Sequence, residues 1–328
     1  MTKTRFSLCI LFLLTLVPGF IQGDATRRAM STLHIITPES QIKPGLTLTA
    51  VFTMPGPNSG VKAILTDEKE GEELVILGET EGIPIRDESG GTRRVWVCFF
   101  GLSSTLDAGA YRITVTGGTD IAPVTRSEEI TVLPHEFPAE TIPLSRDMTA
   151  LRSEPDPRKR EESLELYNLI TSRGREDLYY PDTFIHPLDE YLWKSSPFGG
   201  RRIYEYSDGN KASSVHFGVD YSAPTGTPVK SPASGLVAMA KKRILTGYTA
   251  VIQHLPGVYS LYYHLETLTA GAGDYVEAGD LIGTVGATGL VTGSHLHWEL
   301  RVSGVAVDPE FFLEFPLIDK ERIFSIIR

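Results

Sequence analysis

Two histidines near the C-terminal end of the sequence have a spacing that could support metal chemistry. His295 and His297 lie in VTGSHLHWELR, residues 291–301. Side chains alternate between the two faces of an extended strand, so both imidazoles would point the same way. The apolar residues between and after them would form the opposite, buried face. Because imidazole nitrogens are common ligands of divalent metals, this segment predicts a strand that could hold a metal ion.

A second segment could also place two metal ligands on one face of a strand, and one of them is a carboxylate. His216 and Asp220 begin and end HFGVD, residues 216–220. A spacing of four on a strand again places both side chains on one face. Phe217 would then point toward a core, and Gly218 would leave space for an ion. Two such segments in one region favour a metal site much more strongly than either segment alone.

Two further histidines lie between these segments. His264 occurs in LYYHL, residues 261–265, where alternation places it with Tyr262 and opposite Tyr263. His254 ends a strand pattern just before a Pro-Gly turn. We expect His254 to be solvated, and we give it a weaker claim to a role than His264.

The sequence pattern of the region that contains these histidines, residues 196–315, predicts a compact, antiparallel all-β domain. Gly-Asp, Pro-Thr-Gly and Thr-Gly turns separate many short strand patterns, and no long helical period is visible. One hairpin is predicted over residues 276–282, turning at Ala278 and Gly279. The C-terminal tail, residues 316–328, has apolar positions suited to a short amphipathic helix packed on this domain.

The first half of the chain is predicted to form a separate β domain. Residues 31–134 are rich in β-branched residues, glycine and turn signals, which favours a small immunoglobulin-like β-sandwich. Its five strand candidates are residues 46–54, 61–67, 72–79, 92–102 and 108–118. None of them gathers catalytic side chains.

Residues 135–195 are predicted to be a proline-rich connector with one helix. Asp156 is a suitable N-cap and Pro157 a suitable first helical residue. Leu166, Leu169 and Ile170 give a narrow apolar stripe that would lie across one of the two domains. The fold class that we expect is therefore all-β with two domains and a short helical connector.

Residues 1–23 resemble an export signal. Lys3 and Arg5 precede an apolar run at residues 6–17, and Gly23 is a small residue at a suitable cleavage point. The alternative is an uncleaved N-terminal membrane anchor; with cleavage, we expect no membrane span to remain. The net charge of -10 argues against a nucleic-acid-binding protein.

The cysteine content bears on the metal ligands. Cys9 would leave with the signal, and Cys98 lies in a strand-like apolar run, where we expect it to be buried. One remaining cysteine cannot form an internal disulfide. Any metal is therefore expected to be held by nitrogen and oxygen ligands.

Three segments together carry a family resemblance. HFGVDYSAPTGTPV, then YYHL, then VGATGLVTGSHLHWEL resemble the lysostaphin or LytM type of zinc metallopeptidase, in the family's order and at suitable spacing. That family has a duplicated hybrid motif-like fold and cleaves peptide cross-links in bacterial cell walls. The resemblance covers about residues 196–313 and does not extend to the N-terminal domain.

The resemblance implies a role for each residue. His216, Asp220 and His297 would be the ligands of one Zn²⁺, and His264 and His295 the two catalytic histidines that do not bind it. Three protein ligands leave a fourth position for a water molecule, as in catalytic zinc sites. The sequence does not divide the work of general base and oxyanion stabiliser between the two histidines. Tyr204 is a candidate for an additional hydrogen-bond donor.

The chain departs from the family pattern at two places. Ser294 stands where a proline is common, and Thr249 with Ala250 stands where a Gly-Asn pair is usual. These departures concern the shape of the groove and the choice of substrate.

The expected function is that of an exported zinc endopeptidase in the periplasm or cell envelope, acting on peptidoglycan stem peptides or their cross-links. The alternative is a non-catalytic regulator of the same fold that activates cell-wall amidases. Such relatives lose the zinc residues, whereas this chain keeps all three. The N-terminal domain would be either a spacer or a lid or docking module that responds to a regulatory partner.

Overall fold

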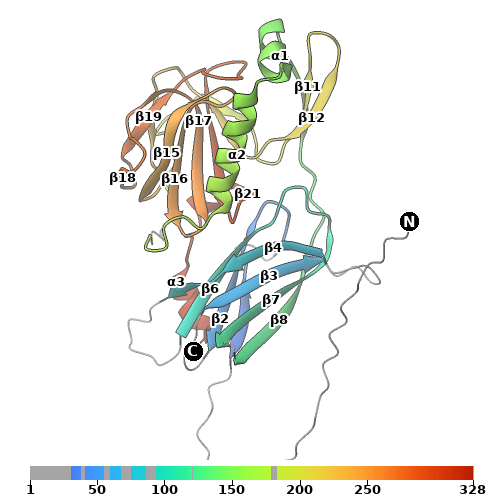
Figure 1. Ribbon diagram of the computed structural model, residues 1–328, viewed down its shortest axis with the longest axis vertical. Helices are drawn as coiled ribbons and strands as arrows, with labels where there is room; N and C mark the ends of the chain where they lie inside the picture. The colour runs from blue at the N-terminus through green and yellow to red at the C-terminus, as the bar shows by residue number, and fades with distance from the viewer. Residues whose placement is uncertain are drawn as a thin grey trace, which may run out of the picture.

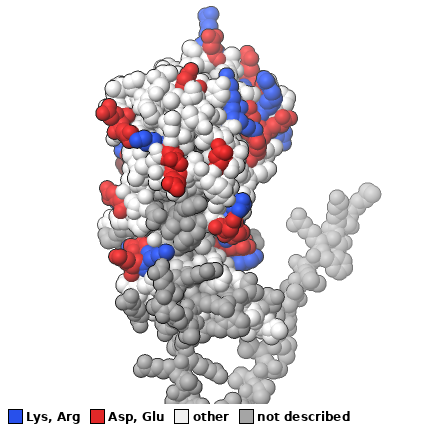
Figure 2. Space-filling view, turned by 90° about the vertical axis from the view of Figure 1, so that its left-hand side faces the viewer, with Lys and Arg blue, Asp and Glu red and all other residues white. Residues whose placement is uncertain are grey.

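The computed structural model describes residues 31–37, 41–54, 60–67, 75–85, 94–119, 121–178 and 183–327. The described part consists mostly of β-strands with three short α-helices, which confirms the predicted all-β class (Figure 1). The predicted export signal lies outside the described residues. No helix in the described part is both long and apolar enough to cross a membrane. On the face drawn in Figure 2, acidic and basic side chains are interspersed.

Two four-stranded antiparallel sheets lie together in the N-terminal part. The first has the order β1-β2-β6-β5 and the second β4-β3-β7-β8. Side chains from both, including Leu48, Phe52 and Ile113, form one buried cluster between the sheets. The five strand candidates correspond to β2, β3, β4, β6 and β7, while β1, β5 and β8 are additional. The strands are β1 (Thr32–Ile36), β2 (Thr47–Met54), β3 (Val61–Asp67), β4 (Val75–Glu81), β5 (Ile83–Ile85), β6 (Arg94–Gly101), β7 (Gly109–Thr119) and β8 (Ala122–Val132).

Strand β6 is buried on both faces. Cys98 and Phe100 belong to the cluster between the two sheets. Val97 and Phe99 point the other way and belong to the cluster shared with the C-terminal part. This explains the continuous apolar run in β6, because a strand covered on both sides needs no polar face. Cys98 is buried as predicted, and burial raises the pKa of its thiol to about 12.

A ten-stranded sheet dominates the C-terminal part. Its main path runs β10-β13-β20-β17-β16-β15-β18, with β14, β19 and β21 paired beside it. Strand β20 lies between β13 and β17, so it has a partner on each side. The strands are β10 (Trp193–Ser196), β13 (Val219–Ser222), β14 (Pro228–Lys230), β15 (Gly235–Arg243), β16 (Gly247–Leu255), β17 (Val258–Leu268), β18 (Tyr275–Val276), β19 (Leu281–Val285), β20 (His295–Val302) and β21 (Val305–Val307).

The connector contributes more structure than the sequence predicted. Its strand β9 (Ala139–Pro143) pairs in parallel with β11 (Arg201–Glu205), which pairs in turn with β12 (Lys211–Val215). Helix α1 (Arg146–Ser153) follows β9 and lies beside this small sheet (Figure 1). Helix α2 (Pro157–Thr171) begins as predicted, because the Asp156 carboxylate accepts a hydrogen bond from the backbone N–H of Arg158.

Helix α2 covers one face of the large sheet. Its predicted stripe of Leu166, Leu169 and Ile170 packs against side chains of β15, β16 and β17. The candidate site described below lies on this same face of β17 and β20. The opposite face of these strands contributes to the cluster that includes residues of the N-terminal sheets.

The C-terminal tail packs between the two parts of the molecule. It follows the 3-10 helix η1 (Pro309–Leu313) and contains helix α3 (Lys320–Ile327), whose Ile323 is buried. The Arg322 guanidinium donates to the carbonyl of Thr37, 2.8 Å away, next to β1. The tail therefore contacts the N-terminal sandwich as well as the large sheet.

The predicted hairpin over residues 276–282 is wrong. Strand β18 pairs with β15, whereas β19 pairs with β14 and β17. The Ala278–Gly279 turn therefore joins strands that have different partners, which a local turn signal cannot indicate.

His254 is completely buried, so the expectation that it is solvated is wrong. Its Nδ1–H donates to the carbonyl of Ser234 at 2.8 Å, and its Nε2 lies 2.7 Å from the Ser260 hydroxyl. Burial lowers the pKa of His254 from 6.5 to about 4. The ring is thus neutral in the folded protein near neutral pH.

Because His254 is buried in its neutral form, we expect the folded protein to lose stability in acid. The unfolded chain takes up a proton below pH 6.5, but folded His254 does so only near pH 4. The contribution of neutral His254 to the free energy of unfolding is therefore complete above pH 6.5 and is lost as the pH falls toward 4. The full loss is about 3 kcal/mol. Denaturant unfolding of the His254→Gln variant between pH 7 and pH 4.5 should show a shallower pH dependence than the unaltered protein. Equal slopes would contradict the assignment.

Candidate metal centre

Strand β20 has the alternation that the sequence predicted. Leu296, Trp298 and Leu300 are fully buried in the core cluster, and His295 and His297 lie on the other face. The neighbouring strand β13 pairs with β20 so that Asp220 lies opposite His297. Paired residues of an antiparallel ladder project to the same side, which brings the carboxylate beside the imidazole.

His216 reaches this point from outside the strand. It lies after β12 and before β13, so HFGVD is not one continuous strand as predicted. Phe217 is 40% exposed beside the Arg301 guanidinium, not in a core. Gly218 is needed for close packing, because a Cβ there would lie 2.3 Å from the carbonyl oxygen of Trp298. The glycine thus permits close approach of two backbones.

His264 reaches the site because strand β17 is irregular. Its φ of 63° lies in the left-handed region, and the pairing of β17 with β16 shifts register between Tyr248 and Ala250. Regular alternation would have placed His264 with Tyr262, which is in the core. Instead both Tyr263 and His264 line the site, so the predicted separation of these two residues is wrong.

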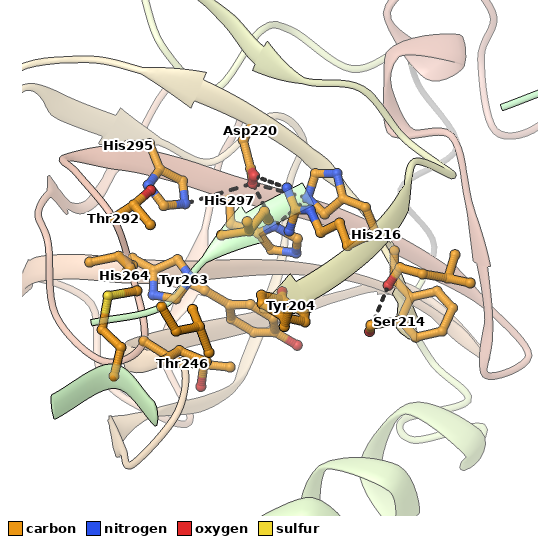
Figure 3. A pocket seen from close by; sticks show the side chains of 18 of the residues that line it. Tyr204, Ser214, His216, Asp220, Thr246, Tyr263, His264, Thr292, His295 and His297 are labelled. Carbon is orange, nitrogen blue, oxygen red and sulfur yellow. Dashed lines mark hydrogen bonds and ion pairs between the residues drawn. The ribbon is translucent and has the colours of Figure 1, made fainter. Parts of the chain in front are cut away.

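Three candidate ligand atoms converge at the centre of the site (Figure 3). His216 Nε2 lies 3.1 Å from Asp220 Oδ1 and 2.9 Å from His297 Nδ1, and His297 Nδ1 lies 2.7 Å from Asp220 Oδ1. All three side chains are buried, and their ligand atoms lie within 4.8 Å of one another. The structure thus brings together the three residues predicted as ligands.

Hydrogen bonds fix the orientation of the two imidazole side chains. His216 Nδ1–H donates to the Pro197 carbonyl at 2.8 Å, and His297 Nε2–H donates to Glu299 Oε1 at 2.8 Å. Each histidine therefore turns its other nitrogen toward the centre. Such outer contacts set the tautomer and raise the basicity of metal-binding imidazoles.

The aspartate is held by a connected set of charges. Arg202 Nη2–H donates to Asp220 Oδ2 at 2.5 Å, and Arg202 Nε–H donates to Glu140 Oε1 at 2.8 Å. Oδ1 of Asp220 is left facing the two imidazoles. Since Glu140 belongs to β9, the connector supports the site, which the sequence did not reveal.

The charges around the centre suit a cation. Burial disfavours the charged form of His297, but the neighbouring Asp220 and Glu299 carboxylates outweigh it and raise its pKa to about 9. The same negative charges would favour a bound cation. Two imidazoles and one carboxylate are a donor set that fits zinc with an open coordination position.

The two predicted catalytic histidines lie beside this cluster, with their ring centroids 4.9 Å apart. His264 Nδ1–H donates to the Thr288 carbonyl and His295 Nδ1–H to the Gly293 carbonyl, each at 2.8 Å. Both Nε2 atoms are therefore free to face the site (Figure 3). Burial, together with the neighbouring histidines, lowers the pKa of His264 to about 3, so its ring is neutral.

These residues line a groove of about 290 Å³. One wall comes from the connector, through Ile142 of β9, Leu144 just after it and Met148 of α1. Tyr204 also lines the groove, with the Arg152 guanidinium 4.0 Å above its ring. No described residue of the N-terminal sandwich is part of this lining, so the lining offers no support for that domain as a lid.

We predict that the contact between His297 and Glu299 strengthens metal binding. Glu299→Gln removes the negative charge that accepts the imidazole N–H but keeps the size of the side chain. We expect metal affinity to fall about 10- to 100-fold, measured by competition with a chelator. Glu161→Gln, on the exposed face of α2, is the matched control and should leave affinity unchanged. Unaltered affinity in Glu299→Gln would show that this contact does not tune the site.

Comparison with known proteins agrees with this geometry. Residues 214–309 match the family model for peptidase family M23, so the chain contains an M23 peptidase domain. A candidate M23 peptidase structure from Pseudomonas aeruginosa aligns with 84% of this chain and 96% of its own, with a TM-score of 0.54 and 22% identity. That likeness concerns the fold, and it extends beyond the matched domain.

Two curated relatives share the peptidase region. The chain is 40% identical over 125 residues to the DD-carboxypeptidase/endopeptidase Mpg of Neisseria meningitidis. It is 37% identical over 123 residues to the peptidoglycan DD-endopeptidase ShyC of Vibrio cholerae. Each match covers 38% of this chain and 28% of the relative, so most of each relative's length lies outside it.

Proposed function

We propose that this protein is an exported zinc-dependent endopeptidase that hydrolyses peptide bonds in peptidoglycan stem peptides or their cross-links. The observation that carries the proposal is the convergence of His216, Asp220 and His297 within 4.8 Å, in a groove that also contains His264 and His295. The names of the M23 relatives support peptidoglycan as the substrate.

His216, Asp220 and His297 would hold the zinc ion. When bound, the ion supplies Lewis-acid activation of water and of the scissile carbonyl. The protein's part is to keep two imidazoles and one carboxylate aimed at one point, and the contacts with Pro197, Glu299 and Arg202 do this.

His264 and His295 would handle the protons of the reaction. With Nδ1–H donated to a backbone carbonyl, each neutral ring presents an Nε2 lone pair that can accept a proton from water. Once protonated, the same nitrogen can donate to the leaving amine or to the developing oxyanion. A pair of such rings side by side can carry out both tasks.

The observed site favours an enzyme over a non-catalytic amidase activator. All three candidate ligands and both further histidines are present and face one groove. We place the protein in the periplasm or cell envelope on the basis of the export signal predicted at residues 1–23. A regulatory partner of the N-terminal domain stays a prediction.

The test is product identification. The purified zinc-loaded protein would be incubated with defined cross-linked muropeptides and with whole sacculi, and released fragments analysed by mass spectrometry. We expect cleavage of one type of peptide bond, and loss of that cleavage after chelation. Failure to release fragments from any substrate type would refute the proposal.

A further inference from the structure

The segment at residues 196–202, which we call the support segment, holds both the ring and the backbone of His216. The Pro197 carbonyl accepts the His216 Nδ1–H at 2.8 Å. The Gly199 N–H donates to the His216 carbonyl at 2.8 Å, and the His216 N–H donates to the Gly200 carbonyl at 2.9 Å. These contacts set the position from which His216 Nε2 faces the centre of the site.

The support segment also holds Asp220. Ser196 pairs with Asp220 in the ladder between β10 and β13. At the other end of the segment, Arg202 Nη2–H donates to Asp220 Oδ2 at 2.5 Å. One short stretch of chain therefore contacts two of the three candidate ligands, so a displacement of this stretch would move both.

The N-terminal sandwich reaches the support segment through Arg201. The Arg201 guanidinium donates from Nη2 to the Ser104 carbonyl and from Nη1 to the Gly199 carbonyl, each at 2.6 Å. Ser104 is buried and lies between β6 and β7 of the sandwich. Hydrogen bonds from a charged donor are among the stronger ones in proteins. A single side chain thus joins the sandwich to the segment that holds His216.

Close packing reinforces this connection. The buried ring of Phe198 lies against Gly45 of the sandwich, where an added Cβ would be 2.7 Å from the ring. The Phe137 ring of the connector lies 4.7 Å from the Arg201 guanidinium. A Cβ on Gly199 would be 2.2 Å from that same ring. Tightly packed contacts of this kind transmit small displacements because they contain no void to absorb them.

We propose that the N-terminal sandwich positions the metal ligands through the support segment, and that Arg201 is the positioning residue that joins the two. Arg201 does not line the groove, and the carbonyls that it binds belong to Ser104 and Gly199. The inference rests on the metal site of the proposed function. It gives the sandwich a task that is neither that of a lid nor that of a spacer.

The alternative is that the Arg201 contact only holds the two parts of the molecule together. Arg173 makes a comparable contact elsewhere, since its Nη1–H donates to the carbonyl of Glu81, in β4 of the sandwich, at 2.9 Å. Arg201 and Arg173 are both half-buried, and Arg173 does not line the groove. Arg173→Met is therefore the matched control for Arg201→Met.

The first test measures the zinc affinity of the full-length protein by competition with a chelator. Arg201→Met should lower the affinity about fivefold, less than the roughly 10- to 100-fold of a residue that bonds a ligand directly. Arg201→Lys keeps a charged donor and should recover part of the loss. Arg173→Met should not change the affinity. Circular dichroism and denaturant unfolding would show that the compared variants are folded and how stable each is.

The second test replaces zinc by Co²⁺, whose visible absorption reports the geometry of its ligands. The Co²⁺ spectrum of Arg201→Met should differ from that of the unaltered protein, whereas the spectrum of Arg173→Met should not.

A change made within the sandwich tests the same connection from the other side. Gly45→Ala would press a methyl group on Phe198 and should also lower zinc affinity and alter the Co²⁺ spectrum. Gly118→Ala is the control for backbone strain, because φ is 107° at Gly118 and 94° at Gly45. Gly118 lies in β7, where an added Cβ would meet the Ala122 carbonyl and not the support segment.

The metal measurements do not depend on cleavage. If the protein binds zinc, Arg201→Met weakens that binding and no peptide is cleaved, the proposed function fails and the positioning role stands. Unchanged affinity and spectrum in Arg201→Met, or equal losses in Arg201→Met and Arg173→Met, would overturn the positioning role and leave the proposed function intact. An unaltered protein that bound no zinc would refute both.

Discussion

Replacing His216 by alanine is expected to abolish both metal binding and hydrolysis. The side chain is buried, its Nδ1–H is held by the Pro197 carbonyl, and its Nε2 faces Asp220 and His297. Without it, two ligands remain, which is fewer than catalytic zinc sites use. Activity should fall on the order of a thousandfold or more, which corresponds to about 4 kcal/mol of transition-state stabilisation.

Metal content and activity would be measured on the same samples. Elemental analysis should give about one zinc ion per unaltered chain and almost none for His216→Ala. His135→Ala is the matched control, because His135 is exposed and lies outside the groove. Circular dichroism would confirm that the variant is folded. A folded His216→Ala protein that retained stoichiometric zinc and full activity would exclude His216 as a ligand.

Replacing His295 or His264 is expected to separate catalysis from metal binding. Neither belongs to the three-residue cluster, although His295 Nε2 lies 3.8 Å from Asp220 Oδ1. His295→Gln should therefore keep its zinc but lose about 10²- to 10⁴-fold in kcat, the usual contribution of a proton-transfer residue. For His264 the suitable change is asparagine, because its φ of 63° is a conformation that asparagine tolerates.

The double variant tests whether the two histidines act together. If the proton is passed within one arrangement, His264→Asn with His295→Gln should be little slower than the slower single variant. Multiplied losses would instead indicate independent tasks. If either single variant kept full activity, that histidine would have no catalytic role.

One residue that supports the site, Glu299, could have been predicted from the sequence, although we did not predict it. Glu299 follows His297 by two positions, so alternation alone places it on the same face of β20. No comparable signal exists for Arg202 and Glu140. They come from β11 and β9, and their contact with each other and with Asp220 depends on a parallel pairing across 62 residues of sequence.

The connector shows why local patterns were insufficient. Its prolines and charged residues predicted a linker with one helix, and α2 was predicted correctly from its cap and apolar stripe. Strand β9 has little apolar alternation, since its pattern is set by pairing with β11 and not by a core. The apolar wall that it and α1 give to the groove followed only from this pairing.

Local sequence patterns were enough to predict the all-β class, the buried and exposed faces of β20, and two segments that could carry metal ligands. These features follow from side-chain alternation and from the ligand chemistry of imidazole and carboxylate, which are local properties. The sequence did not predict that His264 enters the groove through a register shift, that Gly218 permits two backbones to approach, or that Arg202 joins Asp220 to Glu140 of the connector. Each of these depends on the pairing of distant strands, and hydrogen-bond register between such strands is set by the packing of the whole sheet.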